Sequence, residues 1–547
     1  MRTLRRAPLI SIRLLLPALA LAAGACGPPG QAPGEIARSL RGRIHSLHQE
    51  RGAVHGERIL AAGAVRRFYE ARKFKPAWGE GDLDQIVKAI RGIQEDGLTP
   101  SEYHLASLER LAHERESGGS AALDADVDIL LTDAVAAIVD HVRYGRVRPV
   151  SLDPRWNVDP REDAPPLEKE VARIVSAHSA AAAIEAAKPS HFIYRALVGA
   201  LAQLREIVAK GGWPSVPHGG PIKPGASDAR IPAVRARLAT SGELRGSTGS
   251  KSLSYDTKLR KAVELFQARH RLDPNGIIDK DAIDAMNVSA GDRADQVRVN
   301  LERARWVLGG LGDEFLLINL PAFKAYLIRQ GRNIWEGRTQ IGDEGKQTPS
   351  FRAVMRTVVF NPDWTVPPTI LAEEVLDGMR KGEDVLAQKK LVVFDKDNQE
   401  VDPGSIDWGG ATPEGFPYTL RQLPGADNAL GRVKFLFPNK YSIYLHDTPS
   451  RTLFEAERRT FSHGCIRLER PLELATLLLS GQDSWTPAKI SQVIESGSTE
   501  NVELTHPVPV MIVYWTVSVG ATGEIRYARD IYNWDRIVLA ALNAPLL

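Results

Sequence analysis

Cysteine is almost absent from this sequence, since only Cys26 and Cys465 occur in 547 residues. Two cysteines allow at most one disulfide bond, so the surroundings of each thiol carry information. Basic and acidic residues are nearly balanced, since the formal net charge is +3, and no basic block occurs. The sequence therefore gives no reason to propose a nucleic-acid partner. Beyond the N-terminus no apolar run approaches the length of a membrane span, and no internal repeat is found. The length allows about two to four domains.

The N-terminus has the pattern of an export signal. Three arginines within the first six residues precede a short apolar run at 14–25 that ends in small residues. Cys26 follows directly, as in a bacterial lipoprotein signal, although Ala23 replaces the usual leucine. We expect residues 1–26 to be a lipoprotein-type signal peptide with a lipidated Cys26, and residues 27–34 to be a flexible tether; ordinary signal cleavage is the alternative. The protein is then expected in the periplasm, tethered to a membrane.

Cys465 then lacks a disulfide partner, and an unpaired thiol in an oxidising compartment is a liability. One explanation is a buried structural cysteine. The preceding Ser462-His463-Gly464 forms a polar stretch with the character of a turn instead of an apolar strand, which favours a reactive thiol. Because the ordinary pKa of cysteine is about 8.5, such a thiol needs a neighbouring histidine or aligned N–H groups for activation.

A candidate base precedes the thiol in the stretch 441–449, YSIYLHDTP. Its residues alternate in the manner of a strand, with Tyr441, Ile443 and Leu445 on one face and Ser442, Tyr444 and His446 on the other. Tyr444 and His446 are therefore predicted to lie together on the polar face. His446 is favoured over His463 as the base.

Together these residues match a known motif. His446, fifteen intervening residues and then Ser462-His463-Gly464-Cys465 resemble the signature of L,D-transpeptidases with a YkuD-type catalytic domain. Ile466 and Arg467 fit the usual continuation. The stretches 361–371 (NPDWTVPPTIL) and 421–439 (RQLPGADNALGRVKFLFPN) resemble the YcbB-like multidomain subgroup of Gram-negative bacteria.

The resemblance implies a chemistry. Cys465 attacks a peptidoglycan stem tetrapeptide of the diaminopimelate type and releases D-alanine, with His446 as general base. The carbonyl of Asp447 orients the imidazole, and the N–H groups of Gly464 and Cys465 lie where an oxyanion forms. An acceptor amine gives a 3→3 cross-link, whereas water gives L,D-carboxypeptidase activity. The resemblance also implies inhibition by carbapenems, no cofactor or metal, and the possibility of partner proteins in cell-wall synthesis.

Four further residues are candidates for substrate binding. Arg467 suits bidentate contact with a substrate carboxylate, and the alternative is an ion pair with Glu469 or another neighbour. His463 is a candidate for positioning the substrate. Tyr444 and Trp364 are candidate aromatic linings of the site, and the alternative for both is core packing.

The predicted fold class is multidomain α+β. A helical domain is expected at 35–210, where Val127, Leu131, Val135, Ile138 and Val142 form one apolar stripe ending before Gly145. The resemblance to the YcbB-like subgroup implies that it is a scaffold domain. Residues 211–292 resemble a small three-helix peptidoglycan-binding domain, in which Leu259, Val263 and Phe266 share a helical face and Ile283 and Met286 continue the stripe. Residues 293–547 are expected to form a β-rich sandwich, with strands in 316–328, 331–342, 354–361 and 508–519. An insert is expected at about 367–430, because so long a connection is unusual unless it is functional. The resemblance to YcbB-like enzymes implies that this insert caps the active site.

Two other classes of function remain open. His446, Asp447, His463 and Cys465 could ligate zinc, but the sequence has no HExxH motif, and a glycine between histidine and cysteine suits an oxyanion turn better. A noncatalytic envelope anchor that binds peptidoglycan is the other alternative. The intact Cys465, Gly464 and His446 argue against it.

Overall fold

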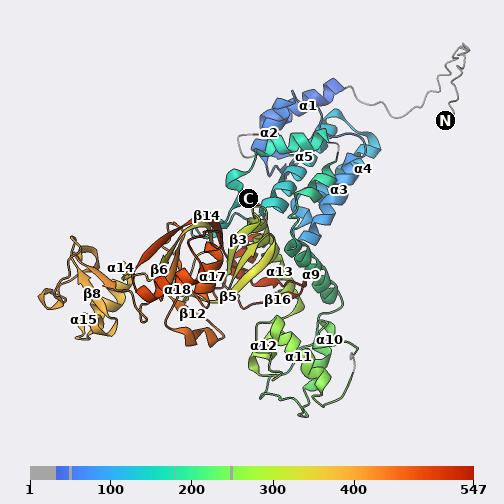
Figure 1. The fold of residues 1–547 in the computed structure, drawn as a ribbon. Coiled ribbons are helices and arrows are strands. Elements are labelled where there is room, and N and C mark those ends of the chain that lie inside the picture. Colours follow the sequence, from blue (N-terminus) through green and yellow to red (C-terminus); the bar gives the residue numbers. More distant parts are fainter. Residues whose placement is uncertain (1–32, 48–51, 178, 247–249, 547) are drawn as a thin grey trace, which may run out of the picture.

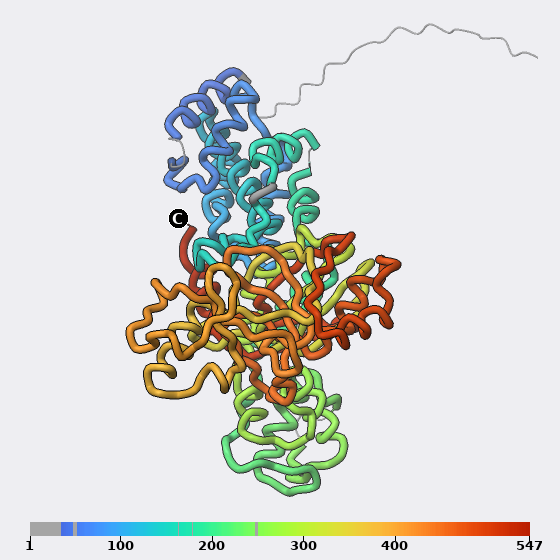
Figure 2. Tube along the Cα trace, turned by 60° about the vertical axis from the view of Figure 1, so that its left-hand side comes forward, coloured from blue at the N-terminus to red at the C-terminus, as the bar shows by residue number. Residues whose placement is uncertain are grey.

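The computed structural model describes residues 33–47, 52–177, 179–246 and 250–546. A helical N-terminal part and a small helical domain lie on opposite sides of a β-rich C-terminal domain (Figures 1 and 2). This arrangement confirms the predicted multidomain α+β class. Cys26 and the signal peptide predicted at 1–26 lie outside the described residues. The first helix begins at Pro33, so the last two residues assigned to the tether at 27–34 are helical.

The N-terminal part is built around the long helix α5 (Ala121–Tyr144). The five residues of its predicted stripe are all buried, but so is every residue from Ala125 to Val139, so α5 is buried on all sides and not along one stripe alone. Around it lie α1 (Pro33–Ser46), α2 (Ala62–Ala71), α3 (Asp82–Gly92), α4 (Leu105–Gly118), α7 (Leu167–Ser176), α8 (Ala180–Ala187) and a small hairpin, β1 (Ala53–Val54) and β2 (Glu57–Arg58). The helices α6 (Pro149–Leu152) and α9 (Phe192–Ala209) pack instead against the core of the C-terminal domain. In the described part of the chain, no helix is both long and apolar enough to cross a membrane.

The small domain contains three helices, as predicted: α10 (Ile231–Thr240), α11 (Thr257–Arg269) and α12 (Lys280–Asn287). The side chains of Leu259, Val263 and Phe266 on α11 are buried against Ile283 and Met286 on α12. Both α11 and α12 begin at an aspartate whose side chain accepts a hydrogen bond from the first turn, an arrangement that satisfies an otherwise unpaired N–H.

Helix α13 (Ala290–Leu308) joins the N-terminal part to the β-rich domain. Arg305 forms a fully buried ion pair with Glu302 at 2.8 Å. Glu302 also accepts the backbone N–H of Val147 at 2.6 Å, and Arg305 donates to the hydroxyl of Tyr194 at 2.9 Å. Through these contacts α13 holds the N-terminal part against the β-rich domain. Removing one partner of the ion pair would leave a buried charge unpaired, so the contact is costly to break.

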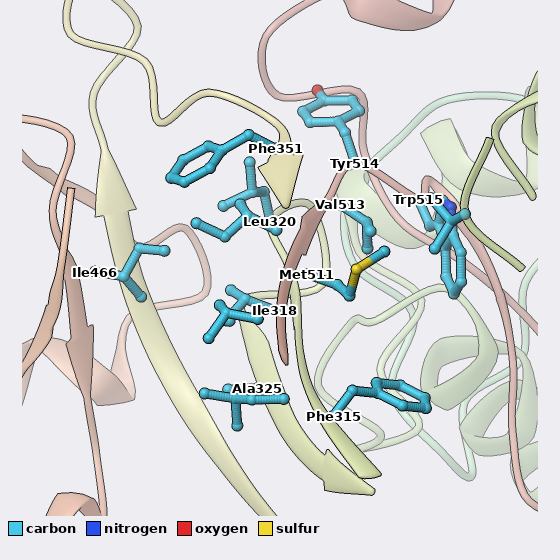
Figure 3. Packing of buried hydrophobic residues seen from close by; sticks show 14 of the residues in the cluster. Phe315, Ile318, Leu320, Ala325, Phe351, Ile466, Met511, Val513, Tyr514 and Trp515 are labelled. Atoms are coloured by element: carbon cyan, nitrogen blue, oxygen red, sulfur yellow. The ribbon is translucent and has the colours of Figure 1, made fainter. Parts of the chain in front are cut away.

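One nine-stranded sheet forms the C-terminal domain, in the order β12-β5-β13-β11-β10-β6-β14-β3-β4. Because β4 also pairs with β5, the sheet folds back on itself around a hydrophobic core. Figure 3 shows part of that core, with Ile318, Ala325 and Ile466 from different strands. The strands are β3 (Glu314–Asn319), β4 (Lys324–Arg329), β5 (Arg332–Gly342), β6 (Phe351–Phe360), β10 (Val433–Leu436), β11 (Leu445–His446), β12 (Thr460–Ser462), β13 (Ile466–Leu468) and β14 (Glu500–Val513). The hairpin of β15 (Val517–Val519) and β16 (Ile525–Tyr527), and helices α17 (Pro471–Leu479), α18 (Pro487–Ser496) and α19 (Trp534–Asn543), complete the domain.

Three predicted strands differ from the observed ones. The run 508–519 is divided between the end of β14 and the strand β15, with residues 514–516 outside both. The run 316–328 is divided between β3 and β4, because the chain reverses direction at 320–323. The strand expected in 441–449 is shortened to Leu445–His446, because Ser442 adopts a left-handed conformation with φ of 55°. The alternation still holds, since Ile443 and Leu445 are buried in the core.

The long connection before the histidine strand forms a subdomain with its own core, which we call the insert (residues 364–430). It contains the sheet β7-β9-β8, made of β7 (Trp364–Thr365), β8 (Leu391–Phe394) and β9 (Thr419–Gln422). Its helices are α14 (Pro368–Ile370), the π-helix η4 (Leu371–Leu376), α15 (Asp377–Arg380) and α16 (Val385–Gln388). The insert projects from the catalytic sheet at the left of Figure 1.

Candidate active site

Cys465 and His446 are brought together by two neighbouring parallel strands. In the β11–β13 pair, Leu445 lies opposite Ile466 and His446 lies opposite Arg467. Leu445 and Ile466 point into the core and are fully buried. Their neighbours Tyr444, His446, Cys465 and Arg467 therefore share the opposite face of the sheet.

The imidazole of His446 is held in one orientation. It is only 4% exposed, and its Nδ1 lies 2.5 Å from the carbonyl oxygen of Asp447. Since a carbonyl accepts, Nδ1 carries the proton and Nε2 keeps a free lone pair. Burial, together with the positive charges of Arg467 and Lys434, lowers the pKa of His446 to about 3. The residue is thus a neutral imidazole near pH 7.

The thiol of Cys465 is half-buried and donates to the carbonyl oxygen of Ser442 at 3.7 Å. Burial raises the pKa of this thiol, against the opposing influence of hydrogen bonds from Tyr444 and the charge of Arg467. Burial and the nearby Cys465 raise the pKa of Tyr444, so its hydroxyl stays protonated. The resting site therefore holds a thiol and a neutral imidazole, and the thiol hydrogen-bonds to the carbonyl of Ser442.

The turn before the cysteine requires a glycine. Gly464 has φ of +117°, and a Cβ there would lie 3.2 Å from Ile443. Ser462 Oγ donates to the carbonyl of Cys465 at 2.5 Å and accepts the N–H of Gly464 at 3.1 Å. Thr348 Oγ1 donates to the carbonyl of Gly464 at 2.7 Å. The tight turn is thus fixed by two buried hydroxyl groups.

These bonds correct one expectation about the oxyanion site. The N–H of Gly464 is not free in this conformation, because it already donates to Ser462 Oγ. The N–H of Cys465, in contrast, has no hydrogen-bond partner within the described ranges. The backbone donor available to an oxyanion is therefore the N–H of Cys465.

Asp447 contributes more than the carbonyl that contacts His446. Its buried carboxylate accepts the N–H of Arg432 at 2.9 Å and the guanidinium of Arg451 at 2.8 Å. Gly431 lies against it with φ of +59°, and a Cβ at that position would lie 2.4 Å from the carboxylate carbon. The carboxylate thus fixes the peptide whose carbonyl orients the histidine.

The candidate substrate residues are placed differently. Arg467 donates from Nη1 to the Gln340 side chain at 3.1 Å and makes no ion pair with a described residue, because Glu469 pairs with Arg338. His463 faces the insert, with Nε2 3.1 Å from Glu374 of η4.

Two aromatic candidates belong to one cluster. Tyr444 packs against the core of the insert and against the His446 ring, with ring centroids 5.6 Å apart. Trp364 is buried within the insert core and has the environment of a packing residue. The structure therefore brings Tyr444 to His446, whereas Trp364 lies in the core of the insert.

Residues that the sequence analysis missed support this site. Thr348 and Gln340 are fully buried polar residues that hold the Gly464 turn and Arg467, and Glu374 anchors His463. The alternation of the strand 433–437 could have identified Lys434, the one charged residue between buried Val433 and Phe435. Thr348, Gln340 and Glu374 are far from the motif in sequence and carry no local signal.

The donor set does not resemble a metal site. No group of three or more His, Cys, Asp or Glu side chains suited to a metal ion occurs among the residues that the structure describes. His446 donates from Nδ1 to a carbonyl, and His463 pairs with Glu374.

Comparison with known proteins agrees with this geometry. Residues 313–494, which include both Cys465 and His446, match the family model of the YkuD L,D-transpeptidase catalytic domain. The chain carries a YkuD-type L,D-transpeptidase catalytic domain. Residues 227–286 match the model described as "Putative peptidoglycan binding domain", and residues 63–201 match that of a scaffold domain. The order of these three domains fits the YcbB-like subgroup.

A relative and two solved structures are similar to this YkuD-domain protein. The "Putative L,D-transpeptidase" of Haemophilus influenzae is 35% identical over 233 residues, which cover 42% of this chain and 47% of the relative. The match thus spans about half the relative's length. An L,D-transpeptidase of Xylanimonas cellulosilytica (residues 123–326) is 12% identical with a TM-score of 0.17, covering 54% of this chain and 99% of that one. An L,D-transpeptidase of Stackebrandtia nassauensis is 12% identical with a TM-score of 0.20, covering 55% of this chain and 96% of that one. At these TM-scores the two structures support no argument about this chain.

Proposed function

We propose that this protein is a peptidoglycan L,D-transpeptidase that works through a thioester on Cys465 and forms 3→3 cross-links. The observation that carries the proposal is the placement of a half-buried thiol beside a neutral histidine whose Nδ1 proton is fixed by Asp447. The matches to catalytic and peptidoglycan-binding domains support peptidoglycan as the substrate.

Acylation begins when His446 Nε2 takes the thiol proton as the sulfur attacks the carbonyl at the L-centre of diaminopimelate. A carbon–sulfur bond forms, and the carbonyl oxygen becomes an oxyanion that accepts the N–H of Cys465. One such donor contributes about 3–4 kcal/mol in other acyl-transfer enzymes. The carbon–nitrogen bond then breaks, His446 returns its proton to the leaving amine, and D-alanine departs.

Transfer repeats these steps with a second stem peptide. Its amine gives a proton to His446 while attacking the thioester, and the sulfur leaves and takes that proton back. The products are a 3→3 cross-linked dimer and the free thiol. Attack by water instead gives a tripeptide, so hydrolysis is the competing outcome of the same intermediate.

The location of the protein belongs to the proposal. The N-terminal pattern of basic residues, apolar run and Cys26 supports export to the periplasm and a lipid anchor on a membrane. A peptidoglycan-binding domain at 227–286 supports work at the cell wall, where partner proteins in cell-wall synthesis are available.

Incubation with purified disaccharide tetrapeptide tests the proposal. Mass spectrometry of the products should show release of D-alanine with a cross-linked dimer of two stem peptides. Loss of D-alanine without any dimer would assign the protein as a carboxypeptidase. A parallel sample treated with iodoacetamide shows whether the thiol is reactive. No change in the substrate, although the thiol in the parallel sample is alkylated, would contradict the enzyme assignment.

A further inference from the structure

A row of polar side chains crosses four strands of the catalytic sheet. Lys434 on β10 lies opposite His446 on β11, His446 lies opposite Arg467 on β13, and Arg467 lies opposite Gln340 on β5. Residues directly opposite each other on neighbouring strands point to the same face. His446 therefore has a cation on each side, Lys434 on one and Arg467 on the other.

Neither cation has an acidic partner. Lys434 is half-buried, and it forms no hydrogen bond or ion pair within 4 Å in the described part of the chain. Asp363 acts on it only from beyond ion-pair distance, and the carboxylate of Asp447 is taken up by Arg432 and Arg451. Arg467 has one bond, to the Gln340 side chain, and its Nε is buried without a partner.

Such an arrangement is costly without a ligand. Holding a partly desolvated ammonium group without a counter-charge is unfavourable, and burial accordingly lowers the pKa of Lys434. An anion placed between or beside these cations would relieve that cost and form charge-assisted hydrogen bonds. The row is therefore suited to a substrate with carboxylates close to the scissile bond.

The two cations face different parts of such a substrate. Arg467 on β13 follows Cys465, which directly precedes that strand, by two residues and acts electrostatically on its thiol, so it lies on the acyl side. Lys434 lies across His446 from that strand and acts on the histidine. Because His446 protonates the leaving amine, the departing residue must lie over His446, toward Lys434.

We propose that Lys434 binds the terminal carboxylate of the departing D-amino acid and so selects donors with a free C-terminus. The amine and the carboxylate carbon of that residue are separated by one carbon, about 2.5 Å. A lysine in the neighbouring row position has the length to reach the carboxylate while His446 serves the amine. This inference rests on the proposed function, since it assigns a specificity residue to the same reaction.

The test compares two donors, a disaccharide tetrapeptide with a free terminal carboxylate and the same compound with a terminal amide. Lys434→Met should lower kcat/KM for the free acid about 30-fold, the value of one charge-assisted bond, and should have a much smaller effect on the amide. Lys434→Arg should recover a large part of the loss. Lys489→Met is the matched control, because Lys489 on α18 is also half-buried and unpaired within the described residues.

Binding gives a second readout that needs no turnover. In the Cys465→Ala background, calorimetry should show that Lys434→Met weakens binding of the free acid and leaves binding of the amide nearly unchanged. Equal losses for both donors, or no loss for either, would overturn the role of Lys434. If the wild type releases nothing but binding keeps this preference, the proposed reaction fails while the carboxylate site stands.

Discussion

The Nδ1 atom of His446 lies 2.5 Å from the carbonyl oxygen of Asp447, the residue that follows it. This contact leaves Nε2 as the free base on the face that also carries Cys465. Because burial lowers the pKa of His446 to about 3 and raises that of Cys465, the resting pair is uncharged near neutral pH. Under the proposed function, the thiolate of Cys465 is thus expected to form only as a substrate is attacked.

The pH dependence of thiol alkylation follows from these shifts. The rate at which iodoacetamide modifies Cys465 should rise steadily with pH through 9, since only the thiolate reacts and its pKa is above the ordinary value. Peptide mapping by mass spectrometry separates this rate from that of Cys26. A plateau of fast alkylation between about pH 6 and 7 would mean that Cys465 and His446 form a stable ion pair, against this account.

Gly431→Ala should disturb the histidine without touching it. The new methyl group would overlap the Asp447 carboxylate at a position with φ of +59°, so either the turn or Asp447 must move. We expect a loss of about 1–3 kcal/mol in unfolding free energy, together with a fall in kcat. Gly425→Ala is the control, because its Cβ would meet nothing within 4 Å and its φ is not positive. Unchanged melting temperature and unchanged kcat in Gly431→Ala would show that the close contact is not required.

β-Lactams should acylate the same sulfur. The resemblance to L,D-transpeptidases predicts that a carbapenem reacts faster than a penicillin. Intact-protein mass spectrometry should show one adduct, and peptide mapping should place it on Cys465. An adduct on a serine would contradict the assignment of the nucleophile.

The insert is expected to govern the fate of the thioester. It reaches the site at η4, where Glu374 binds His463 at 3.1 Å and Lys389 at 2.6 Å, and where Glu373 binds Lys346. Transfer to a scarce amine requires that water be excluded and the acceptor oriented. Glu374→Gln weakens this anchor and should raise the ratio of tripeptide to cross-linked dimer, measured by chromatography.

The controls separate anchoring from a general effect of charge. Glu400→Gln changes the charge of the insert equally at an exposed position without an ion pair among the described residues, and it should leave the ratio unchanged. Replacing residues 367–430 by a short Gly/Ser linker should raise the ratio further while a β-lactam still acylates Cys465. An unchanged ratio in both the Glu374 and the linker variants would show that the insert only stabilises the strands.

Hydrophobic periodicity along the sequence predicted several single helices and strands correctly. The period of Val127, Leu131 and Val135 was enough to predict a helix with buried side chains, although α5 proves to be buried on all sides, and alternation placed Tyr444 and His446 on one side. The site depends on pairings that no local pattern encodes. Gln340 contacts Arg467 across the pairing of β5 with β13, and Thr348, which follows β5 in the chain, donates to the carbonyl of Gly464. Both contacts join residues more than a hundred positions apart.

The prediction that the N–H of Gly464 binds an oxyanion also failed because of a contact that a local pattern does not encode. A motif identifies the glycine, but the direction of its N–H is decided by the hydroxyl of Ser462, which competes for the same donor. For Arg467, the structure lacks a contact that its sequence neighbours had suggested. The alternative to a contact with a substrate carboxylate was an ion pair with Glu469 or another neighbour, and the structure pairs Glu469 with Arg338 instead.

The most direct test of the account is to trap the acyl-enzyme. The full chain is mixed with disaccharide tetrapeptide, quenched in acid within one turnover, and measured by intact-protein mass spectrometry beside Cys465→Ala. The account predicts that the wild type gains the mass of the donor minus D-alanine, that the added mass maps to Cys465, and that hydroxylamine removes it as expected of a thioester. The Cys465→Ala variant, folded with the wild-type melting temperature, should gain no mass. An adduct that persists in that variant, or D-alanine release by the variant at a rate near that of the wild type, would contradict the central claim.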